Sequence, residues 1–164
     1  MQAWLVALVA GTLAVAQQVG PPRSLLEVSS LVSADRVAVG ERFTITLELT
    51  PAPNIHVYAP GVVGYKPIAF TVEPQRGLVI RPLTYPPSET YFYAPLKETV
   101  AVYRKPFRVV QELALDSSPS GRAALKEAAS IVVRATLIYQ ACNDRLCFPP
   151  RTVPMMWTVA VKES

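Results

Sequence analysis

Apolar and polar residues alternate with a period of two in several stretches of the chain, and this alternation limits the folds open to it. In the stretch 43–50 every odd position is apolar and every even position is threonine or glutamate. The stretches 107–115, 131–139 and 153–161 repeat the pattern, although Gln111 interrupts the first of them. A period of two places the apolar side chains on one face of a β-strand. The pattern therefore predicts half-buried strands.

Prolines separate these stretches. The chain contains 16 prolines, and they fall in nearly every gap between the alternating segments. Proline has no backbone N–H and belongs in turns and at sheet edges. We expect further short strands at 25–32, 54–58, 67–72, 78–82 and 98–103, and only 121–129 has helical composition. Many short strands separated by turns predict an all-β antiparallel sandwich in a single domain.

The N-terminal residues have the pattern of a signal peptide. Residues 4–16 form an apolar run that is short for a membrane span and ends in the small-x-small pattern Ala14-Val15-Ala16. We expect a signal peptide over 1–16, cleaved after Ala16, and a domain over 17–164. No lipid anchor is expected because no cysteine follows the run. An uncleaved N-terminal anchor is the alternative, since no Lys or Arg precedes the run. Export would place the domain in an oxidising compartment.

The net charge of +4 comes from basic residues that are scattered singly along the chain. Nucleic-acid-binding domains gather such residues on one face, with aromatic residues among them. We therefore expect no nucleic-acid partner and interpret the charge as favouring solubility.

Both cysteines of the chain lie in the segment YQACNDRLCFPP, residues 139–150. In an exported domain, Cys142 and Cys147 are placed to form a disulfide across a short loop. Such a bridge contributes only about 2 kcal/mol, because a loop of about six residues has little entropy to lose. The small structural gain favours a redox-active pair. An inert local disulfide is the alternative.

A metal centre is a weaker interpretation of the same residues. His56, Met155 and Met156 could join the two thiolates in binding Cu(I). Consecutive residues of a strand point to opposite faces, however, so the two methionines cannot share one site. We expect no metal and no other cofactor.

The cysteine segment, followed by TVPM, resembles the active-site segment of the N-terminal periplasmic domain of DsbD, the thiol:disulfide interchange protein. A weaker similarity runs from about 54 to 161 and includes HVYAPG, GYKPIAF and VAVYRKPF. The resemblance implies an immunoglobulin-like sandwich over 17–164, here expected as a stand-alone chain. The residues that match the motif one by one are Tyr139, Gln140, Cys142, Cys147, Phe148, Pro149 and Pro150.

The resemblance also implies a function in the periplasm. The domain would accept two electrons from a membrane-embedded, DsbD/CcdA-like thiol transporter. It would pass them to periplasmic thioredoxin-fold proteins, including those that serve cytochrome c maturation. Cys142 and Cys147 would alternate between dithiol and disulfide in a monomeric protein, and the analogy favours Cys142 as the cysteine that engages the acceptor. The alternative is a non-catalytic exported binding module with an inert disulfide.

The family's site also has a cap loop whose aromatic side chain covers the cysteines. TYFYAP at 90–95 matches the position of that loop, so Phe92 and Tyr93 are the expected cap residues. His56 and Tyr58 fall where the family has two tyrosines, and the histidine is a departure. Tyr139, Gln140, Phe148 and Pro149 are expected to line the site. The loop between the cysteines is shorter than in the family, and only Glu89 stands near the expected acidic pair.

Overall fold

The computed structural model describes residues 24–94 and 96–162. The expected signal peptide and its cleavage site lie outside these residues. In chain order the elements are β1 (Leu26–Val32), β2 (Arg36–Val37), β3 (Arg42–Pro51), β4 (His56–Tyr58), β5 (Ala69–Val72), β6 (Leu78–Ile80), β7 (Glu89–Tyr93), β8 (Glu98–Tyr103), β9 (Phe107–Leu115), α1 (Pro119–Leu125), β10 (Ser130–Tyr139), β11 (Ala141–Cys142) and β12 (Arg151–Val161).

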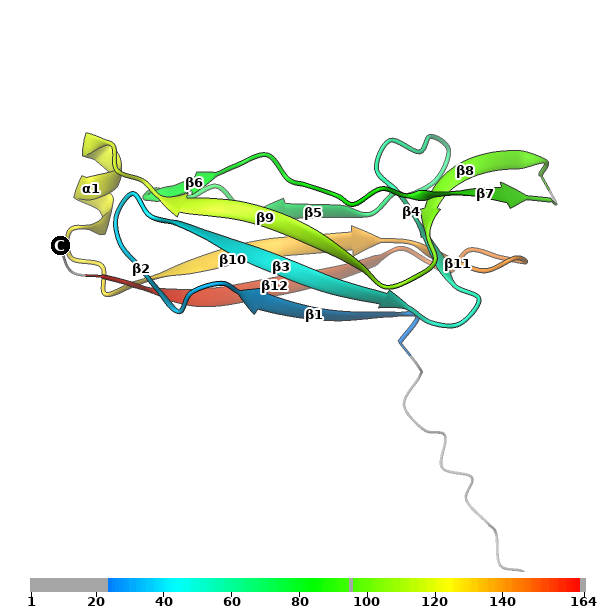
Figure 1. Ribbon diagram of the computed structural model, residues 1–164, viewed down its shortest axis with the longest axis horizontal. Helices are drawn as coiled ribbons and strands as arrows, with labels where there is room; N and C mark the ends of the chain where they lie inside the picture. The colour runs from blue at the N-terminus through cyan, green and yellow to red at the C-terminus, as the bar shows by residue number, and fades with distance from the viewer. Residues whose placement is uncertain (1–23, 95, 163–164) are drawn as a thin grey trace, which may run out of the picture.

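Two four-stranded sheets pack face to face along the length of the molecule (Figure 1). One has the order β1-β3-β9-β6 and the other the order β2-β12-β10-β5. The long pairs β1–β3, β3–β9, β10–β12 and β5–β10 are antiparallel, and only the short pair β2–β12 is parallel. The expectation of an all-β, immunoglobulin-like sandwich is confirmed.

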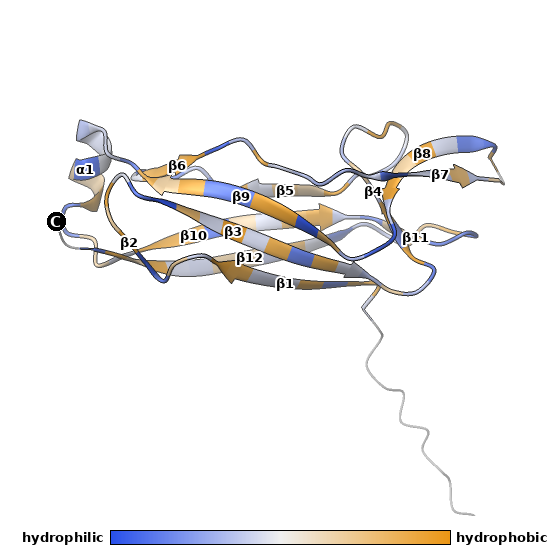
Figure 2. Cartoon of the chain, viewed as in Figure 1, coloured by the Kyte–Doolittle hydropathy of each residue, from blue (hydrophilic) through white to orange (hydrophobic). Residues whose placement is uncertain are grey.

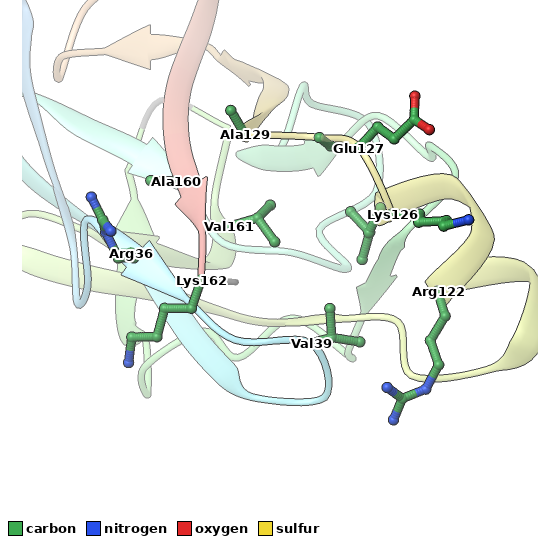
Figure 3. Close-up of a pocket in the computed structure, with 11 residues that line it drawn as sticks. Arg36, Val39, Arg122, Lys126, Glu127, Ala129, Ala160, Val161 and Lys162 are labelled. Atoms are coloured by element: carbon green, nitrogen blue, oxygen red, sulfur yellow. The ribbon is translucent and has the colours of Figure 1, made fainter. Parts of the chain in front are cut away.

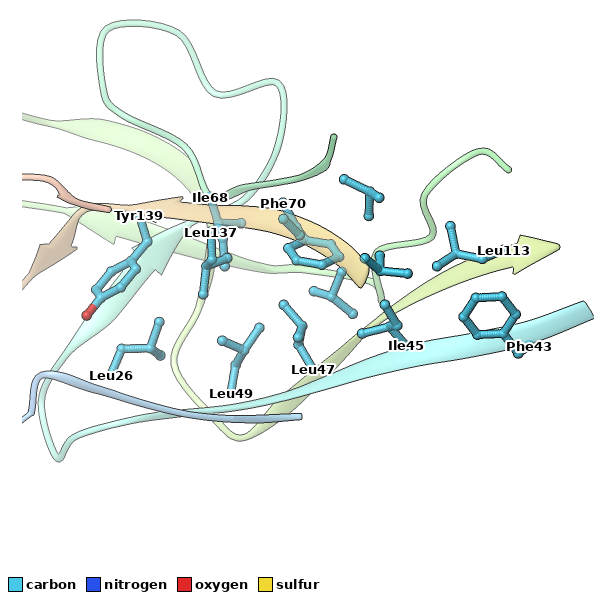
Figure 4. Close-up of a cluster of buried hydrophobic side chains, with 14 of the residues drawn as sticks. Leu26, Phe43, Ile45, Leu47, Leu49, Ile68, Phe70, Leu113, Leu137 and Tyr139 are labelled. Atoms are coloured by element: carbon cyan, nitrogen blue, oxygen red, sulfur yellow. The ribbon is translucent and has the colours of Figure 1, made fainter. Parts of the chain in front are cut away.

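The alternation of residues in the sequence builds the core. Phe43, Ile45, Leu47 and Leu49 of β3 are buried and face side chains of β10 such as Leu137 across the sandwich (Figure 4). Figure 2 shows the same alternation as bands of hydrophobic and hydrophilic residues along β3 and β9. The strands thus bury one face each, as a period of two predicts.

Gln111, which interrupts the apolar face of β9, is buried without leaving its amide nitrogen unpaired. Its Nε2 donates hydrogen bonds to the backbone oxygens of Arg81, at 2.6 Å, and of Glu112, at 2.9 Å. A buried amide is tolerated when its polar atoms are paired in this way.

A third, smaller sheet with the order β11-β4-β8-β7 lies at one end of the sandwich (Figure 1). Val57 of β4 pairs with Ala141 and Tyr103, and all three belong to the main core. The next residues along these strands pair on the other side of the sheet, which we call the outer face; its members are His56, Tyr58, Val102 and Cys142. One face of the small sheet therefore completes the core, and the outer face does not take part in it.

Two expected elements differ from the observed ones. The segment 90–95, interpreted from the resemblance as part of a loop, contributes to strand β7, because Glu89 to Tyr93 pair with β8. The helical segment begins earlier than expected, at Pro119, where the hydroxyl of Ser118 accepts the N–H of Gly121 at 3.1 Å. An N-terminal serine cap followed by proline is a strong helix start, and it fixes the boundary.

The opposite end of the sandwich has a broad hollow between α1, β2 and the end of β12. Its lining includes the apolar residues Val39, Leu125 and Val161 and the basic residues Arg122 and Lys126 (Figure 3). This hollow lies far along the molecule from the cysteines (Figure 1). Within the part of the chain that the structure describes, no helix is long and apolar enough to cross a membrane.

Candidate functional site

The two cysteines form a disulfide at the end of the molecule that carries the small sheet. Cys142 ends β11, and its Cα lies 4.0 Å from the Cα of Cys147. The loop between them is held by its own hydrogen bonds: Asn143 N–H donates to the oxygen of Leu146 at 2.9 Å. The side-chain oxygen of Asn143 also accepts the N–H groups of Arg145 and Leu146, at 2.8 and 2.9 Å. The loop is therefore closed by local bonds as well as by the disulfide.

The two cysteines differ in exposure. Cys142 is 1% exposed, whereas Cys147 is exposed at the rim of the loop. Thiol–disulfide exchange requires an attacking thiolate to reach a sulfur atom in line with the S–S bond. Accessibility thus favours attack at Cys147, in contrast to the analogy, which favoured Cys142.

Cys142 packs into a small cluster on the outer face. Tyr58, Val102 and Cys142 are its buried members, and Val62, Tyr65, Tyr91 and Val100 pack around them. We call this group the end cluster. It is separate from the main core between the large sheets. The buried half of the disulfide is thus enclosed largely by tyrosine rings and valines.

Tyr58 connects the end cluster to the exposed sulfur. Its hydroxyl lies 3.7 Å from Sγ of Cys147, and the phenol is the donor because a disulfide sulfur carries no hydrogen. Burial raises the pKa of Tyr58, and Tyr65, stacked on its ring at 4.2 Å, raises it further. Tyr58 therefore stays protonated at neutral pH and can donate to a thiolate formed at Cys147.

His56 is the neighbour of the buried Cys142 in the small sheet. It is directly opposite Cys142 in the β4–β11 pair, and it is 2% exposed. Its ring meets Tyr58 edge-on at 5.4 Å between centroids and lies tilted against Tyr91 at 4.8 Å. Burial lowers the pKa of His56, Asp144 raises it, and Arg104 lowers it. The net effect is a lowered pKa, which favours a neutral imidazole at neutral pH.

Tyr91 joins the β7–β8 hairpin to the loop between the cysteines. Its hydroxyl donates to Oδ1 of Asp144 at 2.6 Å, and this bond raises the pKa of Tyr91. The guanidinium of Arg104 lies over the ring, 5.1 Å from its centroid. Sequence reasoning did not single out Tyr91 or Arg104. Reading 89–93 as a strand paired with 98–103 would have placed Tyr91 on the outer face beside Cys142.

The expected cap residues lie on opposite faces of β7. Phe92 is 58% exposed and alternates with Tyr91, so its side chain leaves the opposite side of the strand from the end cluster. Tyr93 is half-buried and shares the face of Tyr91. The structure brings Tyr91, rather than Phe92, against the end cluster. The cap role of Phe92 and Tyr93 stays a prediction.

The other expected lining residues support the site from behind. Tyr139 is buried in the main core, and Phe148 packs against that core from its edge. Gln140 donates from Nε2 to the oxygen of Phe148 at 3.1 Å and accepts the N–H of Lys66 at 3.4 Å. These bonds fix the exit of the loop, and Pro149 beyond it is exposed. Within residues 24–94 and 96–162, no three His, Cys, Asp or Glu side chains gather as metal ligands.

Two solved structures of bacterial proteins match the chain, and the first of them shares its fold. The N-terminal periplasmic domain of ScsB from Proteus mirabilis superposes with a TM-score of 0.54 and 13% identity, covering 84% of this chain and 47% of that one. The chain thus spans about half the length of that structure. A conjugative transposon lipoprotein from Bacteroides eggerthii gives a TM-score of 0.33 and 8% identity, covering 84% of this chain and 98% of that one. A search of curated proteins finds no match.

The match to a protein family is more extensive. The family described as thiol:disulfide interchange protein DsbD, N-terminal, matches residues 24–155. This range includes both cysteines, all of the small sheet and most of the sandwich. A disulfide between Cys142 and Cys147 fits a thiol–disulfide exchange domain. The chain belongs to the family of DsbD N-terminal domains.

Proposed function

We propose that this protein carries two electrons at a time by thiol–disulfide exchange between Cys142 and Cys147. The observation that carries the proposal is the asymmetry of the disulfide, which has one exposed cysteine at a rim and one buried in the end cluster. An exposed sulfur can be attacked by a partner thiolate, and a buried neighbour is kept close to resolve the mixed disulfide. An inert structural disulfide has no need of this division.

The exchange balances with a partner dithiol as the reductant. A partner thiolate attacks Sγ of Cys147, the S–S bond breaks, and Cys142 leaves as a thiolate that takes up a proton. The second partner thiol then attacks the partner's own sulfur in the mixed disulfide and releases Cys147. The partner becomes a disulfide, and the domain holds two thiols. The reverse sequence delivers the electron pair to an acceptor disulfide.

The surface around Cys147 suits a protein partner. Four of the six large exposed hydrophobic residues among those described belong to segments at this end: Val63, Phe92, Leu96 and Leu146. They come from the segment after β4, the β7–β8 hairpin and the loop between the cysteines. Exposed apolar residues that gather around a reactive group mark interaction surfaces. We propose that a partner docks here and moves the hairpin.

The proposed partners are a membrane-embedded DsbD/CcdA-like thiol transporter as donor and periplasmic thioredoxin-fold proteins as acceptors. Membership of the DsbD N-terminal family supports partners that exchange thiols. The related ScsB domain is described as periplasmic, which supports a periplasmic location for this one. We propose that the protein acts there as a monomer.

The test is the reduction potential of the Cys142–Cys147 pair. The protein is equilibrated with glutathione buffers of graded ratio, free thiols are alkylated, and the dithiol fraction is read by mass spectrometry. We expect a potential well above about −300 mV, because structural disulfides of exported proteins typically lie below that value. A lower potential, with no exchange over hours, would favour the non-catalytic binding module.

A further inference from the structure

We propose that His56 is the proton acceptor for the Cys142 thiol when that cysteine resolves a mixed disulfide at Cys147. This inference rests on the proposed function and identifies the group that accepts the proton of the Cys142 thiol. His56 is the single histidine of the chain. It stands at one of the two positions where the resembling family has tyrosines, so its chemistry is a property of this protein.

The placement of His56 puts its ring beside the buried sulfur. Residues directly opposite each other in an antiparallel pair have Cβ atoms about 4.5–5.5 Å apart and share a face of the sheet. His56 and Cys142 are such a pair. Both are buried, at 2% and 1% exposure, so bulk water has little access to the thiol once the disulfide opens.

A buried thiol needs a base. Apolar surroundings disfavour the thiolate, yet the thiolate is the form that attacks a disulfide. A neutral imidazole next to the thiol can take its proton as the sulfur attacks. The lowered pKa of His56 keeps the ring in this neutral form at neutral pH.

The other ionisable groups around His56 are poorly suited to accept the proton. On its own strand, Tyr58 has a raised pKa and acts as a donor. From β7, Tyr91 likewise stays protonated, and Asp144 on the cysteine loop already accepts its hydroxyl at 2.6 Å. Arg104, which follows β8, is a cation. Glu98 accepts the hydroxyl of Tyr65 at 2.6 Å, and Glu89 accepts the backbone N–H of Arg104 at 3.2 Å. Of the groups named here, His56 is the one with a lowered pKa and a neutral basic form.

The step balances in charge and electrons. In the dithiol protein the Cys147 thiolate attacks an acceptor disulfide, and half of the acceptor leaves as a thiolate. Cys142 then gives its proton to His56 as its sulfur attacks Sγ of Cys147. The second half of the acceptor leaves with the electron pair, and the Cys142–Cys147 disulfide forms. The His56 imidazolium releases its proton to solvent.

The experiment separates the two steps with dithiobis(nitrobenzoate), an aromatic disulfide whose thiolate product is coloured. Reduced protein and probe are mixed in a stopped-flow instrument across a range of pH. The first thiolate reports attack by Cys147, and the second reports resolution by Cys142. In the wild-type protein we expect the second rate to rise with pH and level off above the pKa of His56, which burial lowers from the usual value of a histidine. The NMR titration of the single histidine in the reduced protein should have its midpoint within about one pH unit of this rise.

His56→Gln and His56→Tyr both remove the base, and the second keeps an aromatic ring in the end cluster. For both variants we expect a second rate at least about tenfold lower at neutral pH, with no plateau and an increase of about tenfold per pH unit. The first rate should be unchanged. Val102→Ala is the matched control, because it disturbs the same cluster without removing a titratable group. It should keep the wild-type pH profile.

The outcomes distinguish a failure of the proposed exchange function from a failure of the role proposed for His56. Release of only one thiolate by the wild-type protein would overturn the proposed function itself, since the pair would not resolve. Release of two thiolates with the same pH profile in wild type and both His56 variants would overturn only the role of His56. If neither variant folds, the wild-type protein alone gives the test, because the pH midpoint of its second rate can be compared with the NMR midpoint of His56. A difference of more than about one pH unit between these midpoints refutes the inference.

Discussion

Reduction of the Cys142–Cys147 disulfide should cost the domain little stability. The two cysteines are separated by 5 positions in the sequence, so the bridge closes a very short loop. The chain-entropy treatment gives about 2 kcal/mol for a loop of this size, against about 4.7 kcal/mol for one of a hundred residues. The native loop keeps its own bonds after reduction, including Phe148 N–H to the oxygen of Ala141 at 2.9 Å. We therefore take about 2 kcal/mol as the upper limit.

The assay is unfolding by urea and, separately, by heat, each followed by far-ultraviolet circular dichroism with and without a phosphine reductant. A loss of about 2 kcal/mol corresponds to a fall in Tm of roughly 4–8 °C for a domain of this size. The slope of the free energy of unfolding against urea should change little, because the sandwich that unfolds is the same. The control is the double variant Cys142→Ala, Cys147→Ala, whose curve should not respond to the reductant.

Loss of the native β signal on reduction alone would refute this reasoning. So would a loss of more than about 4 kcal/mol, which belongs to disulfides that close much longer loops. Either result would make the disulfide a structural element of the fold. An electron carrier has to stay folded in both of its redox states.

Three substitutions test the arrangement around the disulfide. The Cys142→Ser variant keeps the exposed Cys147. It should form a mixed disulfide with oxidised glutathione at least about tenfold faster than Cys147→Ser, because access limits exchange. Equal rates, followed by mass spectrometry, would contradict the assignment of Cys147 as the attacked residue. Tyr91→Phe removes the hydrogen bond to Asp144 and should lower the free energy of unfolding by at most about 1.5 kcal/mol. The same variant should be reduced several-fold faster by a small thiol. An unchanged rate of reduction would show that the β7–β8 hairpin does not restrict access to the disulfide. Phe92→Ala should change the free energy of unfolding by less than about 0.5 kcal/mol, because the side chain is 58% exposed. The cap prediction for Phe92 also requires several-fold faster reduction of this variant, and a stability loss near the 3–5 kcal/mol of a core phenylalanine would make it a packing residue.

The sandwich was predictable because the long strands carry their own signal. Along β3 and β10, residues that face the core are apolar and most of those that face solvent are polar. A period of two can therefore be recognised without knowledge of the partner strand. Short strands have no such signal. β11 contains only Ala141 and Cys142, and it is a strand because β4 lies beside it. That pairing is decided by tertiary structure.

The candidate site was predictable only in its covalent part. The spacing of Cys142 and Cys147 and their shared motif identified the two cysteines that form the disulfide. The environment of the pair depends on which side chains share a face once β4, β7, β8 and β11 are in register. Tyr91 was missed for this reason, since its neighbour Phe92 is also aromatic and differs chiefly in the face of β7 that it occupies. A shift of one residue in register exchanges the two.

The two-faced small sheet has a consequence for how such a protein can diverge. Val57, Ala141 and Tyr103 belong to the folding core, while His56, Cys142 and Val102 alternate with them on the outer face. Substitutions at His56 and Cys142 alter the chemistry around the sulfur atoms without changing the packing that the first set needs. His56, which the resemblance places at a tyrosine position, is accommodated on this face with the sandwich intact. Selection can therefore change the side chains beside the disulfide on one face of the small sheet while folding constrains the other face.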